Sequence, residues 1–297
     1  MKKLALLALA LLACGCAARG VGSPVAAART DTSVAAHPRI DVHPDISDLK
    51  EISSLVPFEA KRVLYVFDID DTLLTSQGDF GGDSWFGWQF DKKNQNPVPC
   101  PLDVVAITTE EKALELTQPD APAIFNSIFE DKILLTSRNA GTARSATVRE
   151  LTRVSDSRKT PFYLPAPLEN ASSGLLFRLE KNQLASYFDG IYMVTGQNKG
   201  TALVYLLKNV LGILDNYETI VLIDDGMSNI EKMSAAMAAA GKDFYGLHYT
   251  RIKKAEATPD QIKAWDESWS LFIDNLKAVS AARAESFLQM PPACDYR

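Results

Sequence analysis

The feature that most constrains this chain is an apolar run that ends in a cluster of carboxylates. Residues 63–67 (VLYVF) are all apolar, β-branched or aromatic, as in a strand buried on both faces. Asp68, Asp70 and Asp71 follow at once. Because burying carboxylates is costly unless a cation neutralises them, the pattern favours a metal or substrate site at the carboxyl end of a parallel strand. An acidic turn after an edge strand is the alternative, and a lone D-x-D pattern would favour it.

Two later apolar runs end near groups suited to binding an anion. The run 133–135 is followed by Thr136, whose hydroxyl can bond a phosphate oxygen or cap the helix that follows. The run 191–194 leads to Lys199 at the start of a predicted helix. A cation is unfavourable there for the helix dipole, so an anionic partner explains Lys199 better, although a solvated lysine is the alternative.

A further apolar strand, 219–223, runs directly into Asp224 and Asp225, and 244–249 predicts a fifth strand. The strands alternate with helical patterns, which is typical of an α/β protein. We therefore predict a doubly wound, Rossmann-like, mostly parallel sheet of five strands. The carboxylates that follow the strands are expected to cluster at one edge of this sheet.

Between the first two strands the pattern loosens, and we predict a small cap insert over residues 75–120. Its segment 78–88 mixes glycines with large aromatic side chains, as in a loop that covers something. Asp83 and Trp85 are candidates for substrate contact because they follow the carboxylate cluster so closely. The aromatic residues Phe86 and Trp88 are better explained by local packing.

The N-terminal residues predict export rather than fold. Residues 1–13 combine two lysines with an apolar run too short to span a bilayer, which is typical of a signal peptide. Residues 14–44 are rich in Ala, Gly, Ser, Thr and Pro and predict a flexible tether. The folded domain is expected over 45–297, with helical spacing from Ile46 onward and amphipathic helices after residue 259 that face the core.

The cysteines add a prediction about location. The sequence LLAC at residues 11–14 resembles the lipobox of bacterial lipoproteins, which implies lipidation of Cys14, with Cys16 as the second choice. No Asp follows Cys14, so the resemblance implies the outer membrane facing the periplasm. A plain secretory signal or an N-terminal core helix is the alternative. Cys100 and Cys294 can pair in an oxidising compartment or remain two separate thiols.

The charge balance excludes one class of partner. With 31 basic and 37 acidic residues the formal net charge is −6, so there is no basic surplus for binding nucleic acid. An acidic protein that handles a phosphorylated anion needs a divalent cation to offset the repulsion.

Taken together, these motifs resemble those of the haloacid dehalogenase (HAD) superfamily over roughly residues 62–251. The segments GGDSWFGWQ, LTSRN, NKGTALVYLL and VLIDDGMSNI are also similar to a family of functionally uncharacterised, often exported bacterial HAD-like proteins. The resemblance rests on four motifs in the expected order: Asp68-Ile69-Asp70-Asp71-Thr72, Thr136, Lys199 and Asp224-Asp225.

The resemblance implies a Mg²⁺-dependent phosphatase that acts on a small phosphorylated substrate. Asp68 would be the nucleophile and Asp70 the general acid and base. Thr136 and Lys199 would hold the phosphate oxygens. The metal ligands would be Asp68, the backbone carbonyl of Asp70, and one or both of Asp224 and Asp225.

Two other functions remain open from the sequence. A phosphotransferase would use the same aspartyl-phosphate with an alcohol in place of water. A HAD-fold binding module of the cell envelope would have no catalysis, although such a module has no reason to keep Asp68 and Asp70 together.

Overall fold

The computed structural model describes residues 39–279, except 58, 77–78, 100, 112, 142–144, 169–173, 180–182 and 254–255. The predicted signal peptide and the lipidation candidates Cys14 and Cys16 lie outside these residues, as do Cys100 and Cys294. Within the described residues, no helix combines the length and the apolar character needed to cross a bilayer.

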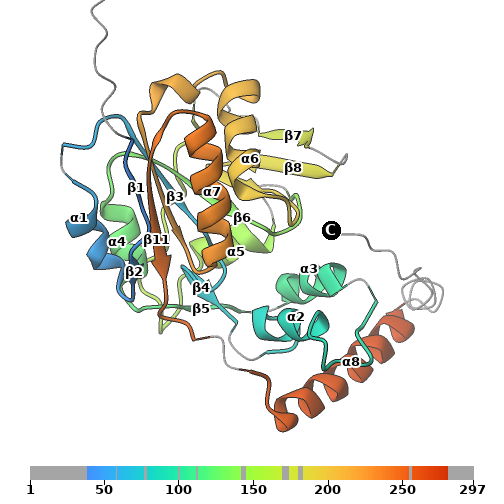
Figure 1. Ribbon diagram of the computed structural model, residues 1–297. Coiled ribbons are helices and arrows are strands. Elements are labelled where there is room, and N and C mark those ends of the chain that lie inside the picture. Colours follow the sequence, from blue (N-terminus) through green and yellow to red (C-terminus); the bar gives the residue numbers. More distant parts are fainter. Residues whose placement is uncertain are drawn as a thin grey trace, which may run out of the picture. The chain divides into compact units, whose positions relative to one another are not determined.

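The described residues form an α/β domain around a mostly parallel sheet (Figure 1). All five strands predicted from the sequence are present, and they are parallel neighbours. In spatial order they are β11 (Asp243–Tyr249), β10 (Thr219–Asp224), β3 (Val63–Phe67), β6 (Asp131–Thr136) and β9 (Ile191–Met193).

The predicted number of strands, five, was too low, because the sheet has nine strands among the described residues. β1 (Asp41–Val42) and β2 (Asp45–Ile46) add in parallel to β11. β8 (Leu184–Phe188) and β7 (Leu175–Arg178) add antiparallel beyond β9. β1 and β2 have two residues each, so no alternation of apolar and polar residues marks them.

The order of the strands fixes where a ligand can bind. From β3 the chain proceeds outward to β6 and β9 on one side, and later to β10 and β11 on the other. The order therefore reverses between β3 and β10, and open α/β sheets bind ligands in the crevice at such a reversal. Phe67 lies opposite Ile223 across this pair, so Asp68 and Asp224 follow at the same edge.

Helices cover both faces of the sheet. Along β3, Leu64 and Val66 contribute to one apolar cluster, and Tyr65 and Phe67 contribute to the other. The strand is therefore buried on both faces, as its composition predicts. The first face is covered by α6 (Lys199–Tyr205), α7 (Met227–Ala239) and the helical turns η3 (Leu206–Val210) and η4 (Leu214–Asn216). The second face is covered by η1 (Leu49–Glu51), α1 (Ile52–Leu55), α4 (Ala121–Ser127) and α5 (Ala146–Thr152).

The predicted insert is a separate packing unit. It leaves the sheet through β4 (Leu74–Thr75), which pairs antiparallel with β5 (Glu115–Leu116), and contains α2 (Asp83–Gln89) and α3 (Pro101–Glu111). The C-terminal helix α8 (Pro259–Val279) packs against this insert (Figure 1). Its Trp265 and Ile273 join Trp85 and Val104 in a third apolar cluster. Trp265 and Ile273 are buried, as predicted, but in the cluster of the insert and not in the two clusters that flank the sheet.

The start of the domain also differs from the prediction. The tether was expected to reach residue 44, but β1 already pairs with β11 before that boundary. Ile46 was expected on a helix and instead lies in β2. The helical segment begins only at η1, because Asp48 and Glu51 form a capping box at its start.

Candidate active site

A buried cation joins the carboxyl ends of β3 and β10. The Nζ of Lys199 lies 2.7 Å from Asp68 Oδ1 and 2.7 Å from Asp224 Oδ2. The three side chains are between 0% and 7% exposed. The anionic partner predicted for Lys199 at the helix start is therefore this pair of carboxylates.

Burial shifts the protonation of this group. Desolvation raises the pKa of the Asp68 carboxyl well above its ordinary value, against the opposing effect of Lys199. Desolvation alone would lower the pKa of Lys199, but Asp224 and Asp68 outweigh it and raise that pKa instead. The two carboxylates therefore favour the protonated form of Lys199, whereas burial disfavours the ionised form of Asp68.

Asp224 and Asp225 have different surroundings. Asp224 Oδ1 accepts hydrogen bonds from the Gly226 N–H (2.8 Å) and from Asn229 Nδ2 (2.9 Å), and its Oδ2 accepts from Lys199. Both oxygens of Asp224 are thus committed to protein donors. The Asp225 backbone N–H donates to Thr72 Oγ1 (3.1 Å), which fixes the position of Asp225 without using its carboxylate.

Asp70 is held by a residue to which the sequence analysis gave no role. Arg138 donates from Nε to Asp70 Oδ2 (2.9 Å) and from Nη2 to Oδ1 (2.7 Å), a bidentate pair. Thr136 Oγ1 lies 3.5 Å from Asp70 Oδ2 and accepts from the Arg138 N–H. Burial alone would raise the pKa of Asp70, but Arg138, with help from Lys199 and Thr136, lowers it.

A tight turn places these carboxylates. The Leu73 and Leu74 N–H groups both donate to the Ile69 carbonyl, which reverses the chain after β3. Asp71 has a φ of 54°, a left-handed conformation that Asp tolerates better than most residues. Its Oδ1 accepts from Thr75 Oγ1 at 2.7 Å.

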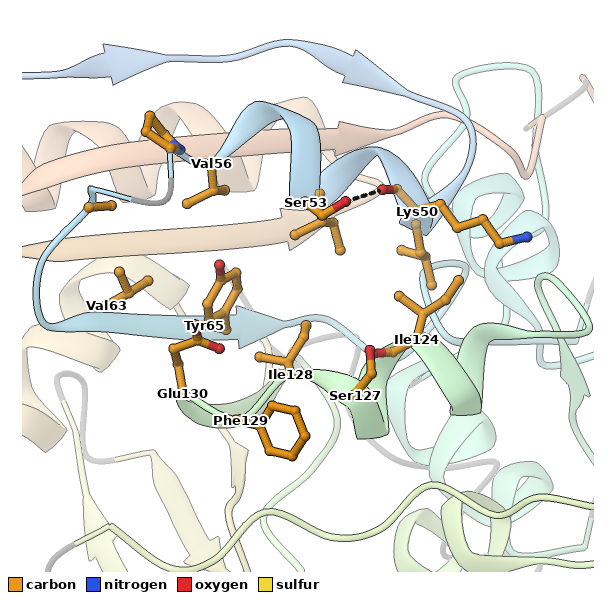
Figure 2. A pocket seen from close by; sticks show the side chains of 14 residues that line it. Lys50, Ser53, Val56, Val63, Tyr65, Ile124, Ser127, Ile128, Phe129 and Glu130 are labelled. Atoms are coloured by element: carbon orange, nitrogen blue, oxygen red, sulfur yellow. Dashed lines mark hydrogen bonds between the residues drawn. The ribbon is translucent and has the colours of Figure 1, made fainter.

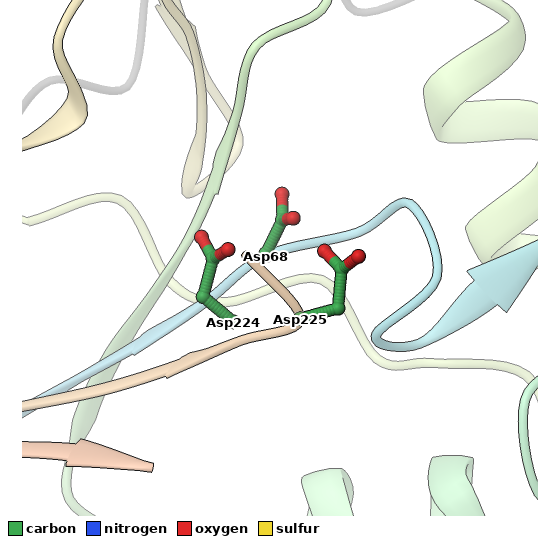
Figure 3. Close-up of side chains that lie close together, drawn as sticks. All are labelled: Asp68, Asp224 and Asp225. Atoms are coloured by element: carbon green, nitrogen blue, oxygen red, sulfur yellow. The ribbon is translucent and has the colours of Figure 1, made fainter. Parts of the chain in front are cut away.

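The carboxylates converge closely enough for a divalent cation. Oxygens of Asp68, Asp224 and Asp225 lie within 4.8 Å of one another, and Figure 3 shows the three side chains meeting from the two strand ends. Carboxylates here outnumber the cations Lys199 and Arg138. Such an oxygen donor set suits Mg²⁺, so these residues fit the predicted metal. Within this group Asp224 is the least suited to bind a metal, because both of its oxygens already accept hydrogen bonds, from Lys199, Gly226 and Asn229.

The two residues predicted to contact substrate, Asp83 and Trp85, lie in different surroundings. Asp83, at the start of α2, lies near the site, since its carboxylate is within 4.8 Å of those of Asp71 and Asp225. Trp85 does not face the site. It is 1% exposed and packs edge-on against Phe80, with ring centroids 5.0 Å apart. Trp85 is a core residue of the insert, and the prediction of substrate contact was wrong.

A cavity on the second face of the sheet has a different lining. This cavity, of about 460 Å³, lies between α1, α4 and β3 and is lined by apolar side chains such as Val56, Tyr65 and Ile128 (Figure 2). Its charged lining residues are Lys50, which pairs with Asp120 at 2.5 Å, and Glu130, which lies near Tyr65, so its lining does not bring several carboxylates together. It is therefore not the candidate site.

Comparison with known proteins gives a family but no activity. Residues 45–281 match the model of a family described as a protein of unknown function (DUF2608). No curated protein and no solved structure matches the chain. Since the family model covers most of the described domain, including every residue of the candidate site, the chain belongs to the DUF2608 family.

Proposed function

We propose that this protein is a Mg²⁺-dependent phosphomonoesterase of the HAD type that works through an aspartyl-phosphate. The observation that carries the proposal is the meeting of Asp68, Lys199 and Asp224 at the reversal point of the sheet, with Asp225 beside them. A nucleophilic carboxylate, a fixed cation and further carboxylates that can hold a metal are what phosphoryl transfer needs. The parallel order of β11, β10, β3, β6 and β9 is compatible with a HAD core.

In the first step an oxygen of Asp68 attacks phosphorus in line. The new Asp68 O–P bond forms as the P–O bond to the leaving alcohol breaks. Lys199 and Thr136 stabilise the charge that develops on the phosphoryl oxygens. Asp70 must first give up its pairing with Arg138 and take up a proton from solvent, and it then donates that proton to the leaving oxygen. A phosphate oxygen competes with Asp70 for the Arg138 guanidinium, so substrate binding favours this exchange.

In the second step water hydrolyses the aspartyl-phosphate. The Asp70 carboxylate takes a proton from the water that attacks phosphorus, and the Asp68 O–P bond breaks to release phosphate. The pairing with Arg138 keeps Asp70 ionised, which suits its role as the base. Mg²⁺, held by Asp68, Asp225 and the Asp70 backbone carbonyl, would supply positive charge to the phosphoryl oxygens.

Asp68→Asn tests this proposal. The amide is nearly the same size but cannot attack phosphorus, so turnover should fall by at least about a thousandfold with little change in melting temperature. Asp156→Asn, a fully exposed carboxylate on the surface, is the matched control and should keep wild-type turnover. The assay is phosphate release from phenyl phosphate with Mg²⁺. Near wild-type rates for Asp68→Asn would refute the aspartyl-phosphate mechanism.

We further propose that the enzyme is exported and anchored through lipid on Cys14, in the outer membrane facing the periplasm. Two or more acyl chains give stable anchoring where one is marginal. Its substrates would then be small phosphomonoesters of the cell envelope. Cys14→Ser should release the protein from membrane fractions or leave it unprocessed, and Cys16→Ser should not. A wild-type protein found wholly in the cytoplasmic fraction would contradict this location.

A further inference from the structure

A second cavity adjoins the candidate site and belongs to no step of the proposed reaction. Its volume is about 310 Å³, near the lower limit of small-molecule sites. Arg138 lines it, and the same guanidinium holds Asp70, the proposed proton donor to the leaving group. The Arg138 side chain is therefore shared by the cavity and by the proposed proton donor.

The walls of the cavity are held in place from both sides. The loop after β6 is fixed by backbone hydrogen bonds from Ala140 to Thr195 Oγ1 (3.0 Å) and from Gly141 to Ser186 Oγ (2.9 Å). The opposite wall is α3 of the insert. Glu110 on α3 accepts from the Ala146 N–H at 3.1 Å, which ties the insert to the start of α5. The cavity thus lies between the insert and the sheet, and hydrogen bonds fix both of its walls.

Two buried polar atoms of the described lining make no hydrogen bond. Asn139 Oδ1 and Ser145 Oγ are buried, yet neither has a hydrogen-bond partner within the part of the chain that the structure describes. Buried polar atoms in folded proteins are nearly always hydrogen-bonded, so an orphaned pair in one cavity points to a ligand. A carbonyl oxygen and a hydroxyl are suited to bind the hydroxyl groups of that ligand.

The rest of the lining narrows the chemistry of the ligand. Two of the described lining residues are charged. Glu110 is paired with Arg149 at 3.8 Å, and Arg138 is paired with Asp70 or, in the proposed reaction, with the phosphate, which favours a neutral leaving group. None of the residues described as lining it is aromatic, so a nucleobase has no ring to stack on. Ile107 and Met193 offer an apolar wall for the carbon face of a small ring or chain.

We infer that this cavity binds the leaving group, and that the leaving group is a small neutral polyol or sugar that Asn139 and Ser145 recognise through its hydroxyls. This inference rests on the proposed phosphatase function and adds the substrate class to it. It also assigns α3 of the insert to substrate selection. Neither Asn139 nor Ser145 touches the reacting atoms, so both determine specificity rather than catalysis.

The test compares two kinds of phosphomonoester. Glucose 6-phosphate and glycerol 3-phosphate carry hydroxyls on the leaving group, and phenyl phosphate carries none. We expect Asn139→Ala and Ser145→Ala each to lower kcat/KM for the hydroxyl-bearing esters about tenfold relative to phenyl phosphate. Ala106→Phe, which fills the cavity from α3, should lower this ratio further. Ser53→Ala, an exposed serine far from the site, is the matched control and should leave the ratio at the wild-type value.

The outcomes separate this inference from the proposed function. Suppose that all three esters are hydrolysed and that this hydrolysis depends on Asp68. If the ratio of kcat/KM for the hydroxyl-bearing esters to that for phenyl phosphate is then the same in Asn139→Ala and Ser145→Ala as in wild type, the inference is wrong and the proposed function stands. The same holds for a wild-type protein that hydrolyses phenyl phosphate but neither hydroxyl-bearing ester. Hydrolysis of none of them, or hydrolysis that survives Asp68→Asn, overturns the phosphatase proposal itself. Thermal melting of each variant shows whether a loss comes from unfolding.

Discussion

Asp68 and Asp70 lie in the same turn after β3, yet the two ion pairs that they form differ in burial and geometry. The Lys199 cation that meets Asp68 also meets Asp224, and all three side chains are nearly inaccessible. The Asp70–Arg138 pair is bidentate, but the Asp70 side chain is 36% exposed.

This difference separates a fixed part of the site from one that can exchange partners. A buried pair that loses one partner leaves an uncompensated charge, whereas water can replace the partner of a half-exposed carboxylate. Lys199 therefore holds the fold together, as well as taking part in the proposed reaction. Arg138 can release Asp70 to a substrate at modest cost.

The largest expected effect tests the buried pair. Lys199→Met leaves Asp68 and Asp224 buried beside each other without a cation, and we expect the free energy of unfolding to fall by about 3–5 kcal/mol. Urea denaturation at neutral pH measures this loss. Lys93→Met is the control, because Lys93 pairs with Glu256 where both side chains are exposed, and it should change little. Equal effects of the two substitutions would contradict the distinction between the two kinds of pair.

The next effect concerns the Mg²⁺ that we propose to bind between Asp68 and Asp225. Mg²⁺ at a hundred times its Kd should stabilise the native state by about 2.7 kcal/mol, as any ligand that binds only that state must. Asp225→Ala should remove most of this gain, which a thermal scan with and without Mg²⁺ measures.

Asp83→Ala is the matched control for the metal prediction. Asp83 shares a second acidic group with Asp71 and Asp225. If Asp83→Ala removed the Mg²⁺ effect as fully as Asp225→Ala, the ion would lie in that second group and not between Asp68 and Asp225. A wild-type protein with no response to Mg²⁺ would contradict the metal site altogether.

The group of Asp68, Lys199 and Asp224 and the Asp70–Arg138 pair also differ in how far the sequence could predict them. Asp68, Lys199 and Asp224 were predictable, because apolar runs mark the strands and the ends of parallel strands meet at one edge. The pairing of Arg138 with Asp70 was not predictable, because it depends on how the loop after β6 turns toward Asp70. The conformation of a loop leaves no periodic pattern in the sequence. An arginine two residues beyond Thr136 was the only signal.

The insert was harder to predict from sequence than the sheet. Its aromatic residues show no period that distinguishes packing from ligand contact, and Trp85 was therefore misassigned. The apolar face of α8 was correctly expected to be buried, but an amphipathic helix does not specify which surface covers it. In the structure it is the insert, through Trp265 and Ile273.

The smallest expected effect tests the Asp70–Arg138 pair, in which the Asp70 side chain is partly exposed, and it depends on pH. Arg138→Met should lower the free energy of unfolding by only about 1 kcal/mol at neutral pH, because solvent screens Asp70. The lowered pKa of Asp70 fixes the sign of the pH dependence. Pairing with Arg138 stabilises the fold above the ordinary pKa of about 3.9, where Asp70 is ionised in both states.

As the pH falls below about 4 through the lowered pKa of Asp70, the carboxyl is protonated and this contribution is lost, so wild type and Arg138→Met should converge in stability. Urea denaturation at several pH values between neutral and acidic measures the gap. Arg62→Met breaks an arginine–carboxylate pair in which both side chains are about half exposed, and it should show a smaller gap. A loss in Arg138→Met as large as that in Lys199→Met would mean that Asp70 is as firmly fixed as Asp68. Arg138 could not then release Asp70 to donate a proton, and the proposed first step would fail.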